Sequence, residues 1–112
     1  MGAEWNTLTD SQKTLLVIIK DLSFYHGSFV PTESISEKYA ALNYKNGIKS
    51  LGADTASLNR TGFTKSRNEQ FMEGHNVSCI EVTKEGMIFL FKNQSNIEAW
   101  KTYKSIHSDK EK

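Results

Sequence analysis

Residues 48–63 read IKSLGADTASLNRTGF, and this stretch decides the fold class of the chain. Its core-type side chains recur at helical spacing: Ile48, Leu51, Thr55 and Leu58. Such spacing places them on one face of an α-helix, and Gly62 can adopt the left-handed conformation that ends a helix. The sequence therefore predicts a helix over about residues 47–61, although Gly52 within it costs about 1 kcal/mol relative to alanine.

The opposite face of this predicted helix is small, polar and cationic. It carries Asn46, Lys49, Ser50, Ala53, Ser57 and Arg60. Residues 43–67 hold five Lys and Arg against Asp54 alone, whereas the whole chain has fourteen basic and thirteen acidic residues and a net charge of +1. A solvated surface is the ordinary interpretation of such a face. The alternative is a surface that enters a DNA groove, where short side chains permit close approach and Lys or Arg contact phosphates or guanine edges.

Two further helices are predicted before this one. Thr9 and Gln12 have the spacing of a capping box, which begins a helix over about residues 10–26. Residues 29–31 should be extended, because a proline disfavours helical backbone in the residue before it. A second helix should then begin at a cap formed by Thr32 or Ser34.

Strands are expected after Gly62. The segment 63–82 has two short β-type runs joined by a polar loop. Residues 83–86 then form either a turn into a strand over 87–91, or the start of a helix that Thr83 caps, with Met87, Leu90 and Phe91 on its inner face. We favour the helix and extend it over about residues 84–107, where Ile97, Trp100 and Tyr103 form an aromatic ridge.

Length and composition indicate one α+β domain. The chain has 112 residues, of which 38% are hydrophobic, enough for a single core. We expect the domain to span residues 8–107, with flexible ends at 1–7 and 108–112. The single cysteine and the lack of a leader or an apolar run of about 18 residues favour a cytoplasmic protein without a membrane span.

No catalytic or metal motif is apparent. The three histidines, at positions 26, 75 and 107, are far apart in the sequence and lack zinc-ligand spacing. We find neither a nucleophile elbow nor a phosphate-binding glycine loop. The sequence therefore predicts a protein that is not an enzyme and has no metal or cofactor.

The order of these signals resembles the winged helix-turn-helix family of DNA-binding domains over residues 8 to about 91. The resemblance includes the Leu-Asn-Arg-Thr-Gly-Phe run at 58–63, and its most specific feature is the spacing from Ala41 through Leu51 and Leu58 to the Gly-Phe pair at 62–63. The segments LTDSQ at 8–12 and GSFVPT at 27–32 are similar to modules in plasmid and phage replication or partition proteins and small regulators. The resemblance implies a three-helix core, a two-stranded wing and an additional C-terminal helix.

This resemblance also implies a function and a site. Residues 47–61 would be the recognition helix in the major groove of double-stranded DNA, and 63–82 the wing on the backbone. The residues expected at the DNA are Lys45, Asn46, Lys49, Ser50, Ser57, Arg60, Lys65 and Arg67. The protein would act in transcription regulation, DNA replication or plasmid partition, in association with the nucleoid or a plasmid.

Small winged-helix proteins usually bind as homodimers, and the first helix with the aromatic ridge is the material for that contact. The ridge fits packing against its own domain equally well.

Two other functions stay open. A protein-interaction adaptor without DNA binding is favoured by the modest net charge and by Glu69 and Glu73 in the expected wing. A small-ligand sensor would use the aromatic interior.

Overall fold

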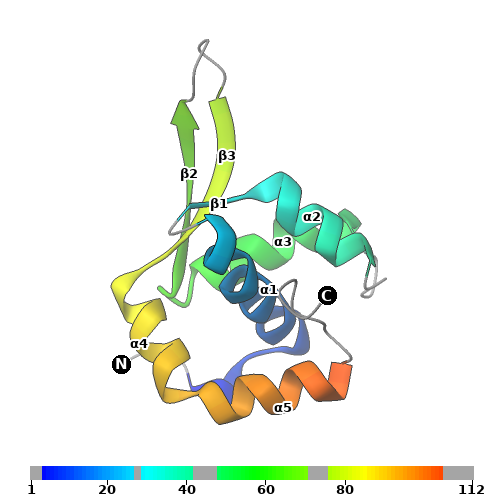
Figure 1. The fold of residues 1–112 in the computed structure, drawn as a ribbon, viewed down its shortest axis with the longest axis vertical. Helices are drawn as coiled ribbons and strands as arrows, with labels where there is room; N and C mark the ends of the chain where they lie inside the picture. Colours follow the sequence, from blue (N-terminus) through cyan, green and yellow to red (C-terminus); the bar gives the residue numbers. More distant parts are fainter. Residues whose placement is uncertain (1–3, 27–28, 42–47, 71–75, 105–112) are drawn as a thin grey trace.

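The computed structural model describes residues 4–26, 29–41, 48–70 and 76–104, which form five α-helices, one short 3-10 helix and a three-stranded antiparallel sheet (Figure 1). The α+β class is therefore as predicted. In chain order the elements are η1 (Trp5–Thr7), α1 (Asp10–His26), β1 (Phe29–Pro31), α2 (Thr32–Ala41), α3 (Ile48–Asn59), β2 (Thr64–Gln70), β3 (Asn76–Val82), α4 (Lys84–Lys92) and α5 (Gln94–Lys104).

Helix α1 is the centre of the fold. The predicted capping box begins it, since the Thr9 N–H donates to Gln12 Oε1 at 2.8 Å and the Gln12 N–H donates to Thr9 Oγ1 at 3.1 Å. Six consecutive residues, 14–19, are buried, because α2, α3, α5 and the sheet all pack around this helix (Figure 1). Every apolar side chain that the structure describes in α1 is buried. None of the described apolar side chains of α1 is thus available for a dimer contact, and the predicted contact through this helix stays a prediction.

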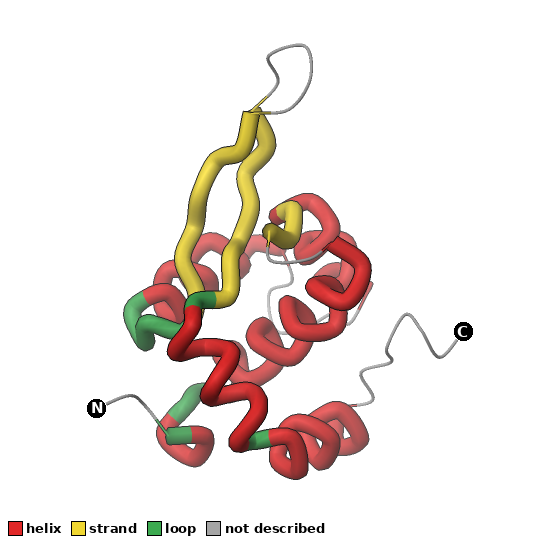
Figure 2. Tube along the Cα trace, turned by 60° about the vertical axis from the view of Figure 1, so that its left-hand side comes forward, coloured by secondary structure: helices red, strands yellow, loops and turns green. Residues whose placement is uncertain are grey.

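The sheet has the strand order β1-β3-β2, with β3 in the centre. The two strands predicted in 63–82 form an antiparallel hairpin in which Lys65 lies opposite Glu81 and Arg67 opposite Cys79. The extended segment that ends at Pro31 adds a short edge strand, with Val30 opposite Ile80. Figure 2 shows the hairpin, in yellow, projecting beyond the helices.

Helix α2 begins directly after Pro31 and buries Ile35 and Tyr39. Ser34 lies inside this helix, so it is not the cap. The hydroxyl of Thr32, the first helical residue, donates to Ser78 Oγ on β3 at 3.1 Å and joins α2 to the sheet.

The segment after β3 is helical, as favoured, but it is two helices rather than one over 84–107. Thr83 caps α4 and accepts a hydrogen bond from the Gly86 N–H at 3.0 Å. The Asn93 side-chain amide donates to the Phe89 carbonyl at 2.8 Å and ends α4. The backbone carbonyl of Asn93 accepts from the Ile97 N–H in the first turn of α5. Asn93 is therefore the corner between the two helices.

The inner face of α4 differs from the prediction. Phe89 and Leu90 are buried with Gly86, whereas Met87 and Phe91 are exposed. A Cβ atom at position 86 would overlap the Phe63 carbonyl and lie 2.9 Å from Val82 Cγ1. Because only glycine permits this approach, Gly86 fixes which side of α4 faces the core.

The N-terminal segment from residue 4 onward packs on the core. Trp5 is 7% exposed, and its ring lies 6.4 Å from those of both Phe89 and Trp100. Residues 4–7 were predicted to belong to a flexible end, whereas the structure packs this segment on the core. Residues 1–3 and 105–112 lie outside the described residues.

The aromatic ridge of α5 packs on its own domain. Ile97 is fully buried, and the Trp100 Nε1–H donates to Thr14 Oγ1 on α1 at 3.1 Å. Of the ridge, only Tyr103 is exposed, so the ridge agrees with the alternative that it packs against its own domain. Among the described helices, none has the length and apolar content needed to cross a membrane.

Candidate nucleic-acid interface

Helix α3 separates an aliphatic face from a face of very small residues. Leu51 and Leu58 are buried in the core, as predicted. Gly52, Ala53 and Ala56 are exposed along the opposite side. Between residues 52 and 56, the outward surface of α3 therefore has almost no side-chain bulk.

Acidic charge is absent from the exposed positions that the structure describes in α3. Asp54 is the only acid of this helix, and its carboxylate accepts a hydrogen bond from the Tyr39 hydroxyl of α2. This hydrogen bond holds the Asp54 carboxylate between α2 and α3, away from the face of small residues. The charge on the outward side of α3 is therefore determined by the basic residues that surround it.

Among the predicted contact residues of this helix, the structure describes some fully, others only by their backbone, and others not at all. Arg60 is exposed, directly after the last helical residue, and its N–H still donates to the Ala56 carbonyl. Lys49 and Ser50 lie in the first turn of α3, where only the backbone is described, and Lys45 and Asn46 lie outside the described residues.

Ser57 lies at the flank of α3 rather than on its outward side. The Gln12 side-chain amide donates to Ser57 Oγ at 2.7 Å and to the Ser57 carbonyl at 3.3 Å. Ser57 is therefore part of the contact between α3 and the start of α1. The outward stripe is narrower than the sequence pattern indicates.

A polar junction fixes α3 to the hairpin. Asn59 accepts a hydrogen bond from the Thr64 hydroxyl at 2.7 Å and donates to Ser66 Oγ at 2.9 Å. Between them the chain turns at Gly62, whose φ is +86°, as the sequence predicts. These bonds fix the position of Arg60 relative to the first residues of β2. Sequence reasoning missed Asn59, although the polar run before Gly62 is a signal for such a turn.

The hairpin carries the other predicted cations. The side chains of Lys65 and Arg67 are 59% and 43% exposed, and both approach one carboxylate oxygen of Glu81, Lys65 Nζ at 3.6 Å and Arg67 Nη1 at 3.1 Å. The Arg67 guanidinium also lies 4.6 Å from the centre of the Phe29 ring. Glu81 thus compensates one of the two positive charges. The sequence analysis missed this residue, which the antiparallel register places opposite Lys65.

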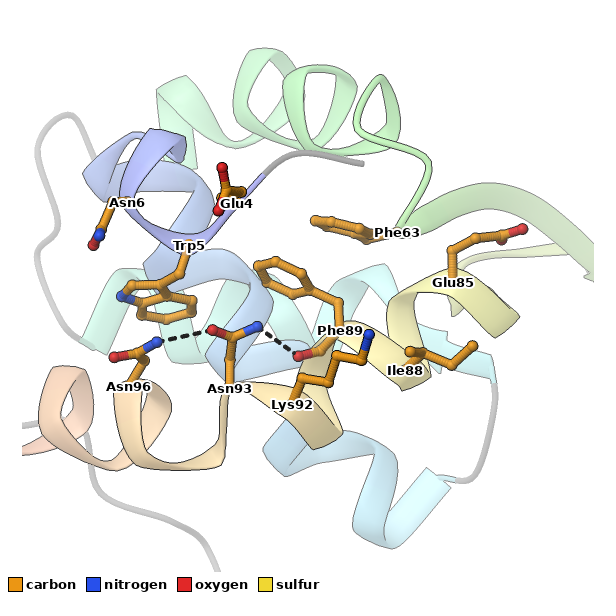
Figure 3. Close-up of a pocket in the computed structure, with 10 residues that line it drawn as sticks. All are labelled: Glu4, Trp5, Asn6, Phe63, Glu85, Ile88, Phe89, Lys92, Asn93 and Asn96. Carbon is orange, nitrogen blue, oxygen red and sulfur yellow. Dashed lines mark hydrogen bonds between the residues drawn. The ribbon is translucent and has the colours of Figure 1, made fainter. Parts of the chain in front are cut away.

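A separate hollow of about 550 Å³ lies between η1, α4 and α5 (Figure 3). Its lining consists of Glu4, Trp5, Asn6, Phe63, Glu85, Ile88, Phe89, Lys92, Asn93 and Asn96. The rings of Trp5, Phe63 and Phe89 are stacked on one another, with Phe63 and Phe89 centres 4.1 Å apart. These rings are nearly buried, and the exposed lining combines polar side chains with that of Ile88.

Comparison of the chain with family models, with curated proteins and with solved structures finds no match.

Proposed function

We propose that this chain is a winged helix-turn-helix protein that binds double-stranded DNA. In this proposal α3 enters the major groove and the β2–β3 hairpin lies along the phosphate backbone. The role would be in regulation, replication or partition of a replicon, as the sequence resemblance implies.

One observation carries the proposal: the outward face of α3 is small and free of described acidic side chains, and it ends at an exposed arginine beside a projecting hairpin that carries Lys65 and Arg67. A helix with its side chains is about 10–12 Å across, and the major groove is about 12 Å wide. Gly52, Ala53 and Ala56 therefore permit the close approach that larger side chains would prevent.

The order of helices and strands along the chain also supports a winged helix-turn-helix fold. Three helices are followed by a hairpin, and the short strand between the first two helices pairs with the inner strand of that hairpin. The hairpin extends past the helical body, where it can reach a backbone next to the groove that α3 occupies (Figures 1 and 2).

The test is the affinity for duplexes obtained by in-vitro selection, measured over a range of salt. Arg60→Ala should weaken binding and reduce the slope of log affinity against log salt by about 0.9 if one phosphate contact is lost. Lys20→Ala on α1 makes the same charge change outside the proposed interface and should leave the slope unchanged.

Glu81→Gln tests the hairpin with the opposite sign. The substitution removes the negative charge that Lys65 and Arg67 share, so affinity should increase and the salt slope should steepen. If neither Arg60→Ala nor Glu81→Gln changes the salt dependence, the assignment of α3 and the hairpin is wrong.

A second candidate is an adaptor that binds protein and not DNA. The exposed apolar side chains of α4, described below, and the compensation of hairpin charge by Glu81 favour it. Electrophoretic shift with random duplex at low salt separates the two, because an adaptor without a groove-reading face gives no retarded complex.

A further inference from the structure

Helix α4 presents an apolar surface to solvent. Met87, Ile88 and Phe91 are 59%, 47% and 75% exposed. Phe91 follows Ile88 by three residues and Met87 by four, which places it next to both on one side of the helix. We call these three residues the α4 face. Burial of apolar surface is favourable, so an exposed group of large apolar side chains on a small domain marks an interaction site.

The α4 face cannot turn inward within the chain. Gly86, Phe89 and Leu90 occupy the opposite side of the helix and are buried. The approach of Gly86 to the Phe63 carbonyl leaves no room for a larger residue on that side. Thr83 fixes the start of the helix through its bonds with Gly86 and with the Gly62 carbonyl. The core contacts of α4 are thus complete without the α4 face.

Two opposite charges flank the face on one side. Glu85 lies near the N-terminus of α4 and Lys92 at its C-terminus, and their separation of seven residues places them on the same flank. Both residues are exposed. Within the part of the chain that the structure describes, neither has an ion pair. They line the rim of the hollow beside α4, as Figure 3 shows.

We propose that a second copy of this chain covers the α4 face, with the two α4 helices antiparallel about a two-fold axis. In such a pair the same flank of each helix meets its own copy. An axis at the level of residues 88 and 89 brings Ile88 against the partner's Ile88 and Phe91 against the partner's Met87. The same axis places Glu85 opposite the partner's Lys92, and Lys92 opposite the partner's Glu85.

Charge complementarity selects a second copy over another occupant. A helix with an acid at one end and a base at the other end of the same flank is complementary to itself only when the partner runs antiparallel. The contact is one helix wide, which is smaller than the roughly 800 Å² per partner of a standard stable interface. We therefore expect a dimer that dissociates on the order of micromolar concentrations. This inference does not depend on DNA binding.

The experiment is sedimentation equilibrium of the full chain, without DNA, over a range of concentrations. Glu85→Lys and Lys92→Glu each place like charges opposite each other at two symmetric positions, so each should weaken dimerisation by about tenfold or more. A mixture of these two variants places opposite charges at both positions again. The mixture should therefore dimerise more tightly than either variant alone, which no effect on a single chain produces.

Phe91→Ser should give a monomer, and Tyr103→Ser is the matched control, because Tyr103 is 73% exposed on α5 and lies outside the face. Far-ultraviolet circular dichroism should show that both variants stay folded. A chain that is monomeric at all concentrations overturns the proposal, and the α4 face then has a different partner. Charge reversals that leave the association unchanged, or a mixture without recovery, also overturn it.

Discussion

Lys101→Met should destabilise the fold strongly, although lysine is normally a surface residue. Lys101 lies in the last turn of α5, and its Nζ is 3.4 Å from Asp21 Oδ1 on α1. The two side chains are 9% and 7% exposed. The other Asp21 oxygen, Oδ2, is buried without a hydrogen-bond partner among the described residues. Lys101 is therefore the group that compensates the buried carboxylate.

The expected magnitude follows from this geometry. Methionine keeps most of the aliphatic volume of lysine, so the substitution removes the charge with little change in packing. Leaving one member of a buried pair without its partner costs about 3–5 kcal/mol of unfolding free energy. We expect the upper part of this range, because Oδ2 has no other bond to compensate it. Domains of this size have a total unfolding free energy of about 5–15 kcal/mol. At about 4 °C for each kcal/mol in a chain of this length, the midpoint of thermal unfolding should fall by about 15–20 °C.

Urea unfolding followed by circular dichroism at 222 nm measures the effect. The double variant Asp21→Leu/Lys101→Met removes both charges and should return to within about 1 kcal/mol of the wild type. Lys104→Met is the control, since its pair with Asp10 is 3.9 Å long and more exposed; it should cost less than about 1 kcal/mol. A Lys101→Met chain as stable as the wild type, or a double variant as unstable as the single one, would refute the reasoning.

Three further substitutions test the packing of α4 and the N-terminus by the same urea assay. Gly86→Ala should cost about 3 kcal/mol, because its Cβ would overlap the Phe63 carbonyl and force α4 away from the sheet. Thr83→Ala should cost about 1–2 kcal/mol through loss of the cap and of the bond to the Gly62 carbonyl; Thr83→Ser should restore most of this. Trp5→Ala should cost about 3–5 kcal/mol, whereas a Trp5 in a flexible end would cost almost nothing.

Local chemistry made three of the helix boundaries predictable. The Thr9–Gln12 capping box, the Thr83 cap and the positive φ of Gly62 depend on residues close in the sequence, and all three are present. Each feature satisfies backbone groups that a helix end leaves without partners. Such signals need no knowledge of the tertiary structure.

The rotation of α4 was not predictable in this way. Residues 87–91 are all apolar, so a helical pattern fits several inner faces equally well. The contact between Gly86 and the Phe63 carbonyl, across more than twenty residues, decides which face is buried. The burial of Lys101 likewise depends on Asp21, a distant residue on α1. A sequence pattern indicates a periodicity, whereas the partner across the core determines its phase.

The candidate interface was predictable in part for the same reason. The inward positions of Leu51 and Leu58 follow from helical spacing, and Arg60 is exposed as expected. Ser57 lies at the edge of the predicted outward face, where the approach of Gln12 from α1 decides its environment. Glu81 could be identified as a partner of Lys65 only once the register of the hairpin was known.

The composition of α3 constrains how it would read DNA. Gly52, Ala53 and Ala56 supply no hydrogen-bonding side chain, so base recognition by the described face would be limited to Arg60 and to alanine contacts with thymine methyl groups. Phosphate contacts would then supply most of the affinity, which makes it strongly salt-dependent. A described face with so few base-contacting side chains would gain specificity if two half-sites were bound at once. If α3 binds DNA and α4 pairs two chains, the preferred site is an inverted repeat, and Phe91→Ser should lower affinity for the repeat while leaving the affinity for a single half-site unchanged.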